Sequence, residues 1–157
     1  MLELLIDNQQ DDYLIPSDAV LKLWANEALK KTGDVQVSLI IVDETESQRL
    51  NNEFRGQDKP TNVLSFPMDM PAELLESVDQ LMLGDLVICA SVVETEAKQQ
   101  NKLADAHWAH MIVHGMLHLQ GYDHIDDNDA EAMEAKEIQL LKQLGFENPY
   151  HINPEKA

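Results

Sequence analysis

The stretch from His114 to His124, which reads HGMLHLQGYDH, places the tightest constraint on how this chain folds. On a helix, His114 and His118 project from the same face one turn apart, so both imidazoles can reach one metal ion. Gly121 favours the end of that helix, because glycine adopts the left-handed conformation that closes a helix without steric cost. The reversed chain then brings His124 back as a third ligand. Three neutral nitrogens with an open fourth position are typical of a catalytic zinc site rather than a structural one.

Four histidines fall on nearly one stripe of the predicted helix: His107, His110, His114 and His118. His110 and His118 are eight residues apart, roughly 12 Å along the helix axis, which is too far for both to bind one ion comfortably. The coordinating pair is therefore either His110 with His114 or His114 with His118. We prefer the second pair, because it alone is followed by a glycine turn and a further histidine. His107 and His110 are then interpreted as partly buried, hydrogen-bonded residues that support the site.

Gly115 distinguishes this pattern from that of a known class of zinc proteases. The same ligand spacing occurs in metzincins, where the residue after the first histidine is a glutamate that acts as general base. In this chain that position holds Gly115. A zinc peptidase or another metal-dependent hydrolase is retained as an alternative, but the missing proton acceptor weakens the peptidase interpretation.

Hydrophobic periodicity and capping signals predict an α+β fold, in which a mixed sheet of about four strands packs with about five helices. The first strand, first helix and second strand form a natural parallel crossover unit. The run Val35–Val42 becomes continuously apolar, which is typical of a strand that is buried on both faces and central in the sheet. Asp43 and Glu46 form a capping-box pattern at the start of the second helix. The predicted strands span residues 2–6, 35–42, 62–66 and 83–89, the predicted helices span about 18–32, 43–54, 91–101, 105–120 and 127–144, and residues 68–81 are expected to form a surface excursion.

Length and composition indicate one domain over residues 1–157, because 157 residues with 44% hydrophobic content suffice for one sizeable core. No apolar run approaches the roughly 20 residues needed to span a bilayer, and we expect no secretory signal. The single cysteine, Cys89, lies in an apolar run and is expected to pack in the core. These features predict a cytoplasmic protein with no membrane partner.

The formal net charge of −18 argues against a broad electrostatic grip on nucleic acid, which depends on lysines and arginines that displace counterions from phosphates. The charge is uneven along the chain. Carboxylates gather after Asp123, whereas Arg49, Arg55 and Lys59 cluster before the middle of the sequence. A local basic site on an acidic body is compatible with this pattern.

Three separated blocks resemble the YbeY family, bacterial single-strand-specific endoribonucleases involved in ribosomal RNA maturation. The blocks are HGMLHLQGYDH at 114–124, FRGQDKPTNVLSFP at 54–67 and GDLVI at 84–88. They occur in the family's order, and the resemblance covers most of the chain. Asn62 departs from many members, which have aspartate at that position, so we assign it no essential acid-base role.

The resemblance implies one zinc ion held by His114, His118 and His124, with Arg55 as the family's functional arginine. Zinc lowers the pKa of bound water to about 7 and acts as a Lewis acid, and a fixed guanidinium pairs with phosphate and stabilises developing charge. His114 and Arg55 are therefore the predicted catalytic residues. The implied activity is cleavage of RNA phosphodiester bonds in ribosomal RNA processing, including maturation of the small-subunit 3′ end, and in ribosome quality control. The implied partners are ribosomal RNA and the ribosome or its proteins.

Several alternatives stay open at this stage. Without the resemblance, Arg55 is interpreted as one half of a surface ion pair, and Lys59 is a weak candidate for a second phosphate contact. The attacking group is either zinc-bound water or the RNA 2′-hydroxyl. A third class of function is a non-catalytic ribosome assembly factor with a structural metal. The acidic body predicts weak affinity for free RNA, with delivery by the ribosome or a partner. Capping and turn hydrogen bonds are the preferred roles of Thr61, Ser65 and Asp85.

Overall fold

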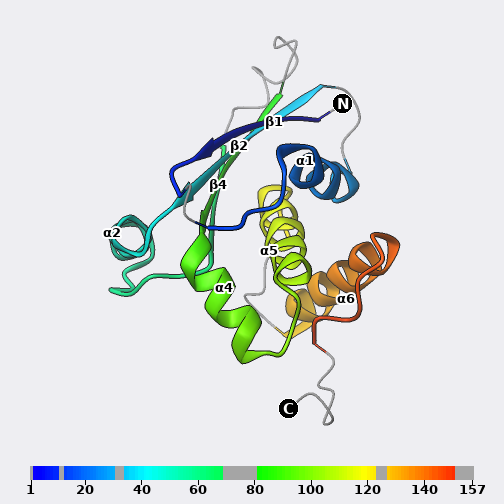
Figure 1. Cartoon of the computed structure of the whole chain (residues 1–157). Coiled ribbons are helices and arrows are strands. Elements are labelled where there is room, and N and C mark those ends of the chain that lie inside the picture. The colour runs from blue at the N-terminus through cyan, green and yellow to red at the C-terminus, as the bar shows by residue number, and fades with distance from the viewer. Residues whose placement is uncertain (1, 11–12, 31–33, 69–80, 123–126, 151–157) are drawn as a thin grey trace.

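The computed structural model of the chain describes residues 2–10, 13–30, 34–68, 81–122 and 127–150. Within these ranges the chain forms four strands and five helices (Figure 1). Residues 69–80, which make up most of the predicted surface excursion, and the predicted ligand His124 lie outside the described residues. The elements in chain order are β1 (Leu2–Asn8), α1 (Asp18–Glu27), β2 (Val35–Val42), α2 (Glu44–Arg55), β3 (Val63–Pro67), β4 (Leu81–Cys89), α4 (Ala90–Gln99), α5 (Ala104–Leu119) and α6 (Asp127–Gln143).

The four strands form one mixed sheet in the order β1-β2-β4-β3. β1 pairs with β2 and β2 pairs with β4 in parallel, whereas β3 runs antiparallel to β4 at the edge. The parallel β1-α1-β2 unit is the predicted crossover, and β2 is an inner strand as predicted. The predicted α+β class with a four-stranded mixed sheet is therefore confirmed.

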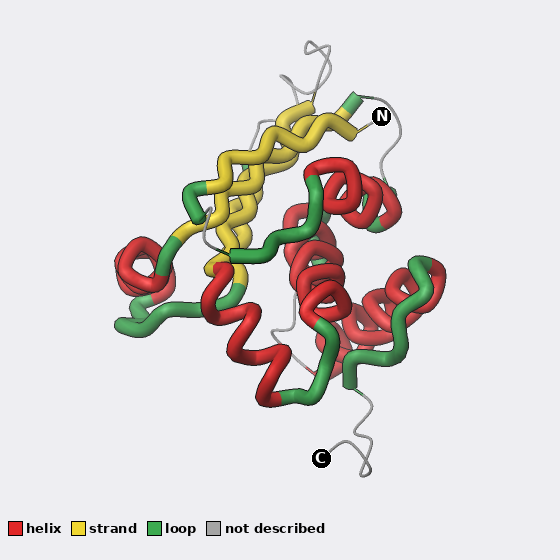
Figure 2. The backbone as a smooth tube through the Cα atoms, viewed as in Figure 1, coloured by secondary structure: helices red, strands yellow, loops and turns green. Residues whose placement is uncertain are grey.

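Helices cover both faces of the sheet, so the inner strands are buried on both sides. α1 and α5 pack on one face, and α2 lies alone on the opposite side in the view of Figure 2. On the first face β2 contributes Val37, Leu39 and Ile41, each fully buried. On the α2 face a smaller cluster of Val42, Leu64 and Val87 packs with partly buried Leu50 of α2 and others. This arrangement agrees with the apolar run predicted for a central strand.

α5 is the helix on which α1, α4 and α6 assemble. It contacts α1, α4 and α6 as well as β3 and β4, and most of its side chains are buried. A helix that is apolar on nearly all sides belongs in a core. Gly115 allows the close approach of α5 to the sheet, because an added Cβ would lie 2.6 Å from Cδ2 of the fully buried Leu86. The position where metzincins carry glutamate therefore has no room here for a longer side chain.

Most helix ends follow the local signals read from the sequence. The predicted extension of the first helix to residue 32 is wrong, because α1 ends at Glu27 and the N–H of Lys30 bonds to the side chain of Gln120 instead of continuing the helix. The side chain of Asp43 accepts a hydrogen bond from the Glu46 N–H at 2.8 Å, which is the predicted cap of α2. α5 ends at Leu119, and Gly121 takes a positive φ of 100° just beyond it, as the turn requires. α4 begins at Ala90 directly after β4, one residue before the predicted start. Buried Cys89 packs in the core as predicted. Among the described residues, none of the helices is long and apolar enough to cross a bilayer.

Candidate metal centre and arginine pocket

The histidine stripe runs along α5 from a buried end to a more open one. His107 and His110 are buried, whereas His114 and His118 are partly exposed. The Nε2 atoms of His114 and His118 lie 3.2 Å apart. A tetrahedral zinc ion with Zn–N bonds of about 2.0–2.1 Å holds neighbouring nitrogens about 3.3–3.4 Å apart. This separation is that of a long hydrogen bond between the two rings, and it is also close to the separation that one metal ion requires.

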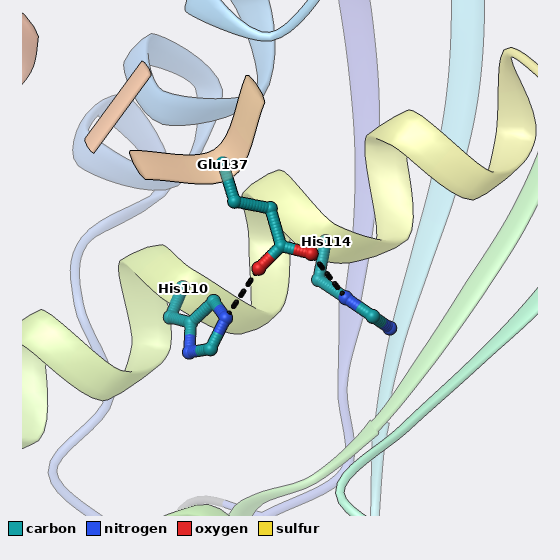
Figure 3. Close-up of side chains that lie close together, drawn as sticks. All are labelled: His110, His114 and Glu137. Carbon is teal, nitrogen blue, oxygen red and sulfur yellow. Dashed lines mark hydrogen bonds and ion pairs between the residues drawn. The ribbon is translucent and has the colours of Figure 1, made fainter. Parts of the chain in front are cut away.

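Glu137 of α6 reaches across to the stripe and joins two of its histidines (Figure 3). Its Oε1 lies 2.8 Å from Nδ1 of His114, and its Oε2 lies 2.6 Å from Nε2 of His110. The hydroxyl of Tyr150 donates a further hydrogen bond to Oε2 at 2.6 Å. A carboxylate with 1% exposure is thus held by three donors from two other parts of the chain.

The charge state of Glu137 fixes the tautomer of His114. Burial alone raises the pKa of this carboxyl, but the hydrogen bonds from His110 and His114 outweigh burial and lower the pKa to about 2. An ionised carboxylate only accepts hydrogen bonds, so Nδ1 of His114 carries the proton. Nε2 of a neutral His114 then presents its lone pair toward His118, which is the state that a metal ligand needs.

A second grouping is also compatible with a metal ion. His110, His114 and Glu137 offer ligand atoms that all lie within 4.8 Å of one another. Among the residues that the structure describes, these three form the group whose spacing could hold an ion. Its nitrogen–oxygen separations of 2.6 and 2.8 Å are hydrogen-bond lengths, and they are shorter than the spacing of about 3.3 Å around tetrahedral zinc. The distances therefore favour a supporting network over direct ligation by this group.

Glu137 is not predicted as a site residue from the sequence, because it is one of many carboxylates in the acidic last part of the chain. A signal was present, because Glu137 occupies a buried position on the apolar face of α6, one turn after Met133 and one turn before Leu140 and Leu141. A carboxylate in such a place needs partners. The interpretation of His107 and His110 as buried, hydrogen-bonded residues is confirmed, since their Nε2 atoms contact Glu96 at 2.9 Å and Glu137 at 2.6 Å.

Arg55 shares a small pocket with His118, although α2 and α5 are far apart in sequence. The pocket has a volume of 250 Å³. Among the described residues Arg55 forms no ion pair, so its guanidinium is not committed to a carboxylate there. Arg49, in contrast, pairs with Glu46 and Glu53 and does not join a basic cluster. The pocket is lined by Arg55, Ser65, Pro67, His118, Gly121 and Tyr122.

The polar residues near the pocket have local structural roles. Main-chain groups of Thr61 bond to the side chain of Ser47 at 3.0 Å, and Oγ of Ser65 lies 3.5 Å from the Gly115 carbonyl. The amide of Asn62 donates to Glu96 at 2.9 Å. The bonds of Thr61 and Asn62 tie the loop before β3 to α2 and α4, and the bond of Ser65 ties β3 to α5.

The fold and the site together define a class: an α+β protein with a histidine-based candidate metal centre beside an arginine pocket. The chain matches the family described as endoribonuclease YbeY over residues 5–145, and it belongs to that family. It is 56% identical over 138 residues to endoribonuclease YbeY of Alteromonas mediterranea, a match that covers 87% of this chain and 85% of the relative. The family predicted from the sequence blocks is therefore confirmed, and so is the enzyme class, an endoribonuclease.

The fold also has a counterpart among solved structures. The solution structure of a Thermotoga maritima protein is 30% identical in sequence and superposes with a TM-score of 0.58. The match covers 92% of this chain and 89% of that protein.

Proposed function

We propose that residues 1–157 form one hydrolase domain that acts as a zinc-dependent, single-strand-specific endoribonuclease in ribosomal RNA processing. The proposal includes maturation of the small-subunit RNA 3′ end and ribosome quality control in the cytoplasm. The observation that carries it is the 3.2 Å approach of two imidazole nitrogens at a pocket that also contains Arg55. Family membership supports the nuclease activity, and the geometry supports the metal.

The proposed ligands are His114, His118 and His124. These three ligands are all imidazoles, which suit zinc better than oxygen ligands do. Three protein ligands also leave a fourth position open, as in catalytic zinc sites. Glu137 serves as a positioning residue, because it accepts the Nδ1–H of His114 and thereby turns Nε2, the proposed ligand atom, toward His118. When bound, zinc supplies Lewis acidity that lowers the pKa of water to about 7 and polarises a phosphoryl oxygen.

Arg55 is proposed to bind the phosphate at the cleaved bond. A guanidinium offers a planar fork of donors that matches phosphate oxygens, and a preorganised donor stabilises the charge that develops as the bond breaks. The position of Arg55 at the last residue of α2 places it at the rim of the His118 pocket. The arginine and the histidines then act on the same phosphate.

Two features of the chain oppose the alternatives. Gly115 lies against Leu86 with no space for the glutamate of a metzincin, which disfavours peptide hydrolysis. The arginine lining the pocket favours phosphate chemistry over a purely structural metal. The charge of −18 supports delivery to RNA by the ribosome or a ribosomal protein, because the body of the protein repels a polyanion.

Single-turnover cleavage of a single-stranded RNA tests the proposed function. Arg55→Ala should lower the rate about 10²–10³-fold, the usual cost of removing a preorganised donor to a developing anion. His118→Ala and chelated protein should be inactive. Arg49→Ala is the matched control, because Arg49 lies on the same helix but pairs with Glu46 and Glu53. Equal cleavage by all preparations would indicate a contaminating nuclease. Metal-dependent folding with full activity of Arg55→Ala would indicate a structural metal.

A further inference from the structure

A second and larger cavity lies at the buried end of the histidine stripe. Its volume is 1010 Å³, at the upper end of the range of about 300–1,000 Å³ typical of ligand pockets. It is bounded by α4, the first turns of α5 and the segment that follows α6. His107 and His110 line it, whereas Arg55 and His118 line the smaller pocket. The proposed chemistry therefore leaves this cavity without a role.

Two buried nitrogens beside the cavity lack partners among the described residues. They are Nδ1 of His107 and Nδ1 of His110, in side chains that are 3% and 9% exposed. The Nε2 atom of each ring faces a carboxylate and carries the proton, so Nδ1 of a neutral ring is an acceptor. A buried acceptor without a donor is costly, and such groups usually mark a missing partner.

Glu96 adds a stronger acceptor to the same wall. Its Oε1 accepts hydrogen bonds from His107 and Asn62, each at 2.9 Å. Burial alone raises the pKa of Glu96, but these hydrogen bonds outweigh burial and lower the pKa, so the carboxylate is ionised. Its second oxygen, Oε2, makes no hydrogen bond to another described residue. The cavity lining thus includes an ionised carboxylate with one oxygen that bonds to no other described residue.

The rest of the lining supplies one cation and an apolar rim. The half-buried amine of Lys102 is the cationic side chain among the described lining residues. The ring of Tyr150 is 43% exposed and is fixed at the rim by the bond from its hydroxyl to Glu137. Leu103 is 79% exposed at the rim. A flat ring with N–H donors on one edge and a carbonyl acceptor beside them fits this combination of groups.

We propose that this cavity binds an unstacked guanine base of the RNA substrate. Guanine carries a ring N–H and an amino group side by side, which suit the carboxylate of Glu96, and its carbonyl oxygen suits Lys102. Uracil has one N–H between two carbonyls, and adenine has an amino group but no ring N–H on that edge. Bases in single-stranded RNA are commonly read on such edges while they stack on aromatic rings.

The cavity lies close enough to the proposed cleavage site for a neighbouring base to enter it. His110 lines the cavity, and His114 follows one turn later, about 6 Å along the axis of α5. Glu137 bonds to both histidines. This inference rests on the proposed endoribonuclease function, since it assigns a base subsite to the same RNA.

Cleavage of oligouridylates that carry a single guanosine, moved through the sequence one position at a time, tests the assignment. With zinc-loaded full-length protein we expect cleavage at a fixed offset from the guanosine, with kcat/KM about tenfold or more above that of the guanosine-free oligonucleotide. Glu96→Gln should bring this ratio to about one, mainly through KM. An oligonucleotide with inosine, which lacks the amino group, in place of guanosine should show a smaller increase in kcat/KM.

Two further variants separate base recognition from general damage. Glu94→Gln removes the same charge from a partly exposed position of α4, where Glu94 pairs with Lys98, and should keep the guanosine preference. Lys102→Gln leaves the Glu96–His107 pair intact and should weaken the guanosine preference. This variant therefore tests the base subsite independently if Glu96→Gln lowers the melting temperature. Cleavage independent of guanosine position would overturn the base subsite while the nuclease function stands, whereas no cleavage of any oligonucleotide would overturn the function itself. Inhibition by guanosine monophosphate without any guanosine preference in RNA would assign the cavity to a free nucleotide instead.

Discussion

At the scale of single residues, Glu137 gives the histidine stripe one defined pattern of protons. Its two oxygens receive His114 on one side and His110 with Tyr150 on the other. The carboxylate that accepts these hydrogen bonds is almost completely buried, so little water competes with the donors. A helix from the last part of the chain thereby determines which nitrogen of His114 faces His118.

Replacing Glu137 should weaken metal binding at the proposed zinc site. We expect Glu137→Gln to lower zinc affinity about 10–100-fold, since loss of a carboxylate partner to a ligand histidine has this effect. Competition titration with a chromogenic chelator measures the change. Glu131→Gln, an exposed change on the same helix, should leave the affinity as it is. Unaltered affinity in a normally folded Glu137→Gln protein would remove Glu137 from the metal site.

Glu96 predicts how stability depends on pH. Its carboxyl has a pKa below 4.5 in the folded protein because of the hydrogen bonds from His107 and Asn62. A lowered folded pKa means that the contribution to stability is complete above pH 4.5 and is lost as the pH falls from there through the folded pKa. Glu96→Gln should therefore flatten the fall in the free energy of unfolding below pH 4.5. Urea unfolding at a series of pH values measures it, and an unchanged slope would contradict the assignment.

At the scale of elements, the edge strand β3 carries one wall of the arginine pocket and depends on a glycine in its neighbour. Gly84 of β4 pairs with Pro67 and has a φ of +148°. A Cβ at this position would lie 2.4 Å from the carbonyl oxygen of Phe66. The close approach of β3 to β4 is thus possible only without a side chain at residue 84, and it places Ser65 and Pro67 beside His118.

Gly84→Ala should destabilise the protein and displace β3. The overlap with main-chain atoms costs about 1–3 kcal/mol, and the positive φ adds about 1–3 kcal/mol of strain. Urea denaturation measures the loss. Gly145→Ala is a matched control, because Gly145 has a φ of +92° but nothing within 4 Å of an added Cβ. The control should lose only about 1–2 kcal/mol from strain. Equal losses in both variants would show that the overlap is relieved without cost.

The elements could be predicted from sequence to a greater extent than the site. Strands such as Val35–Val42 and the cap at Asp43 depend on local periodicity and local hydrogen bonds, which a sequence displays directly. The pairing of Glu137 with His114 depends on how α6 crosses α5, which no local pattern encodes. Gly115 shows a mixed case. Its sequence position excluded the metzincin glutamate, but its contact with Leu86 requires the packed sheet.

At the scale of the whole molecule, a small cationic site lies on a strongly acidic body. The net charge is −18, while the two pockets contain Arg55 and Lys102 as their cations among the described residues. Phosphates approaching the protein meet repulsion over most of its surface and attraction over little of it. We therefore expect a partner that neutralises this repulsion to bring the protein and its RNA substrate together.

Binding to isolated single-stranded RNA should show a shallow dependence on salt. Each phosphate neutralised by a cation contributes about −0.7 to the slope of log K against log salt, so two cations predict a slope of about −1 to −2. Fluorescence anisotropy of a labelled oligonucleotide, measured with inactive His118→Ala protein, gives the slope. A slope steeper than about −4 would require a broad basic surface and would contradict this prediction.

The contact between α6 and α5 has a consequence for the order of events during protein synthesis. Chains emerge from the ribosome N-terminus first, so His114 is made before the carboxylate of Glu137 that orients it. A nascent chain that ends between the two helices holds its histidines without that carboxylate. Loading of the proposed metal site is therefore delayed until α6 has been translated. If the substrate is ribosomal RNA as proposed, this delay keeps the nuclease inactive until most of its own translation is complete.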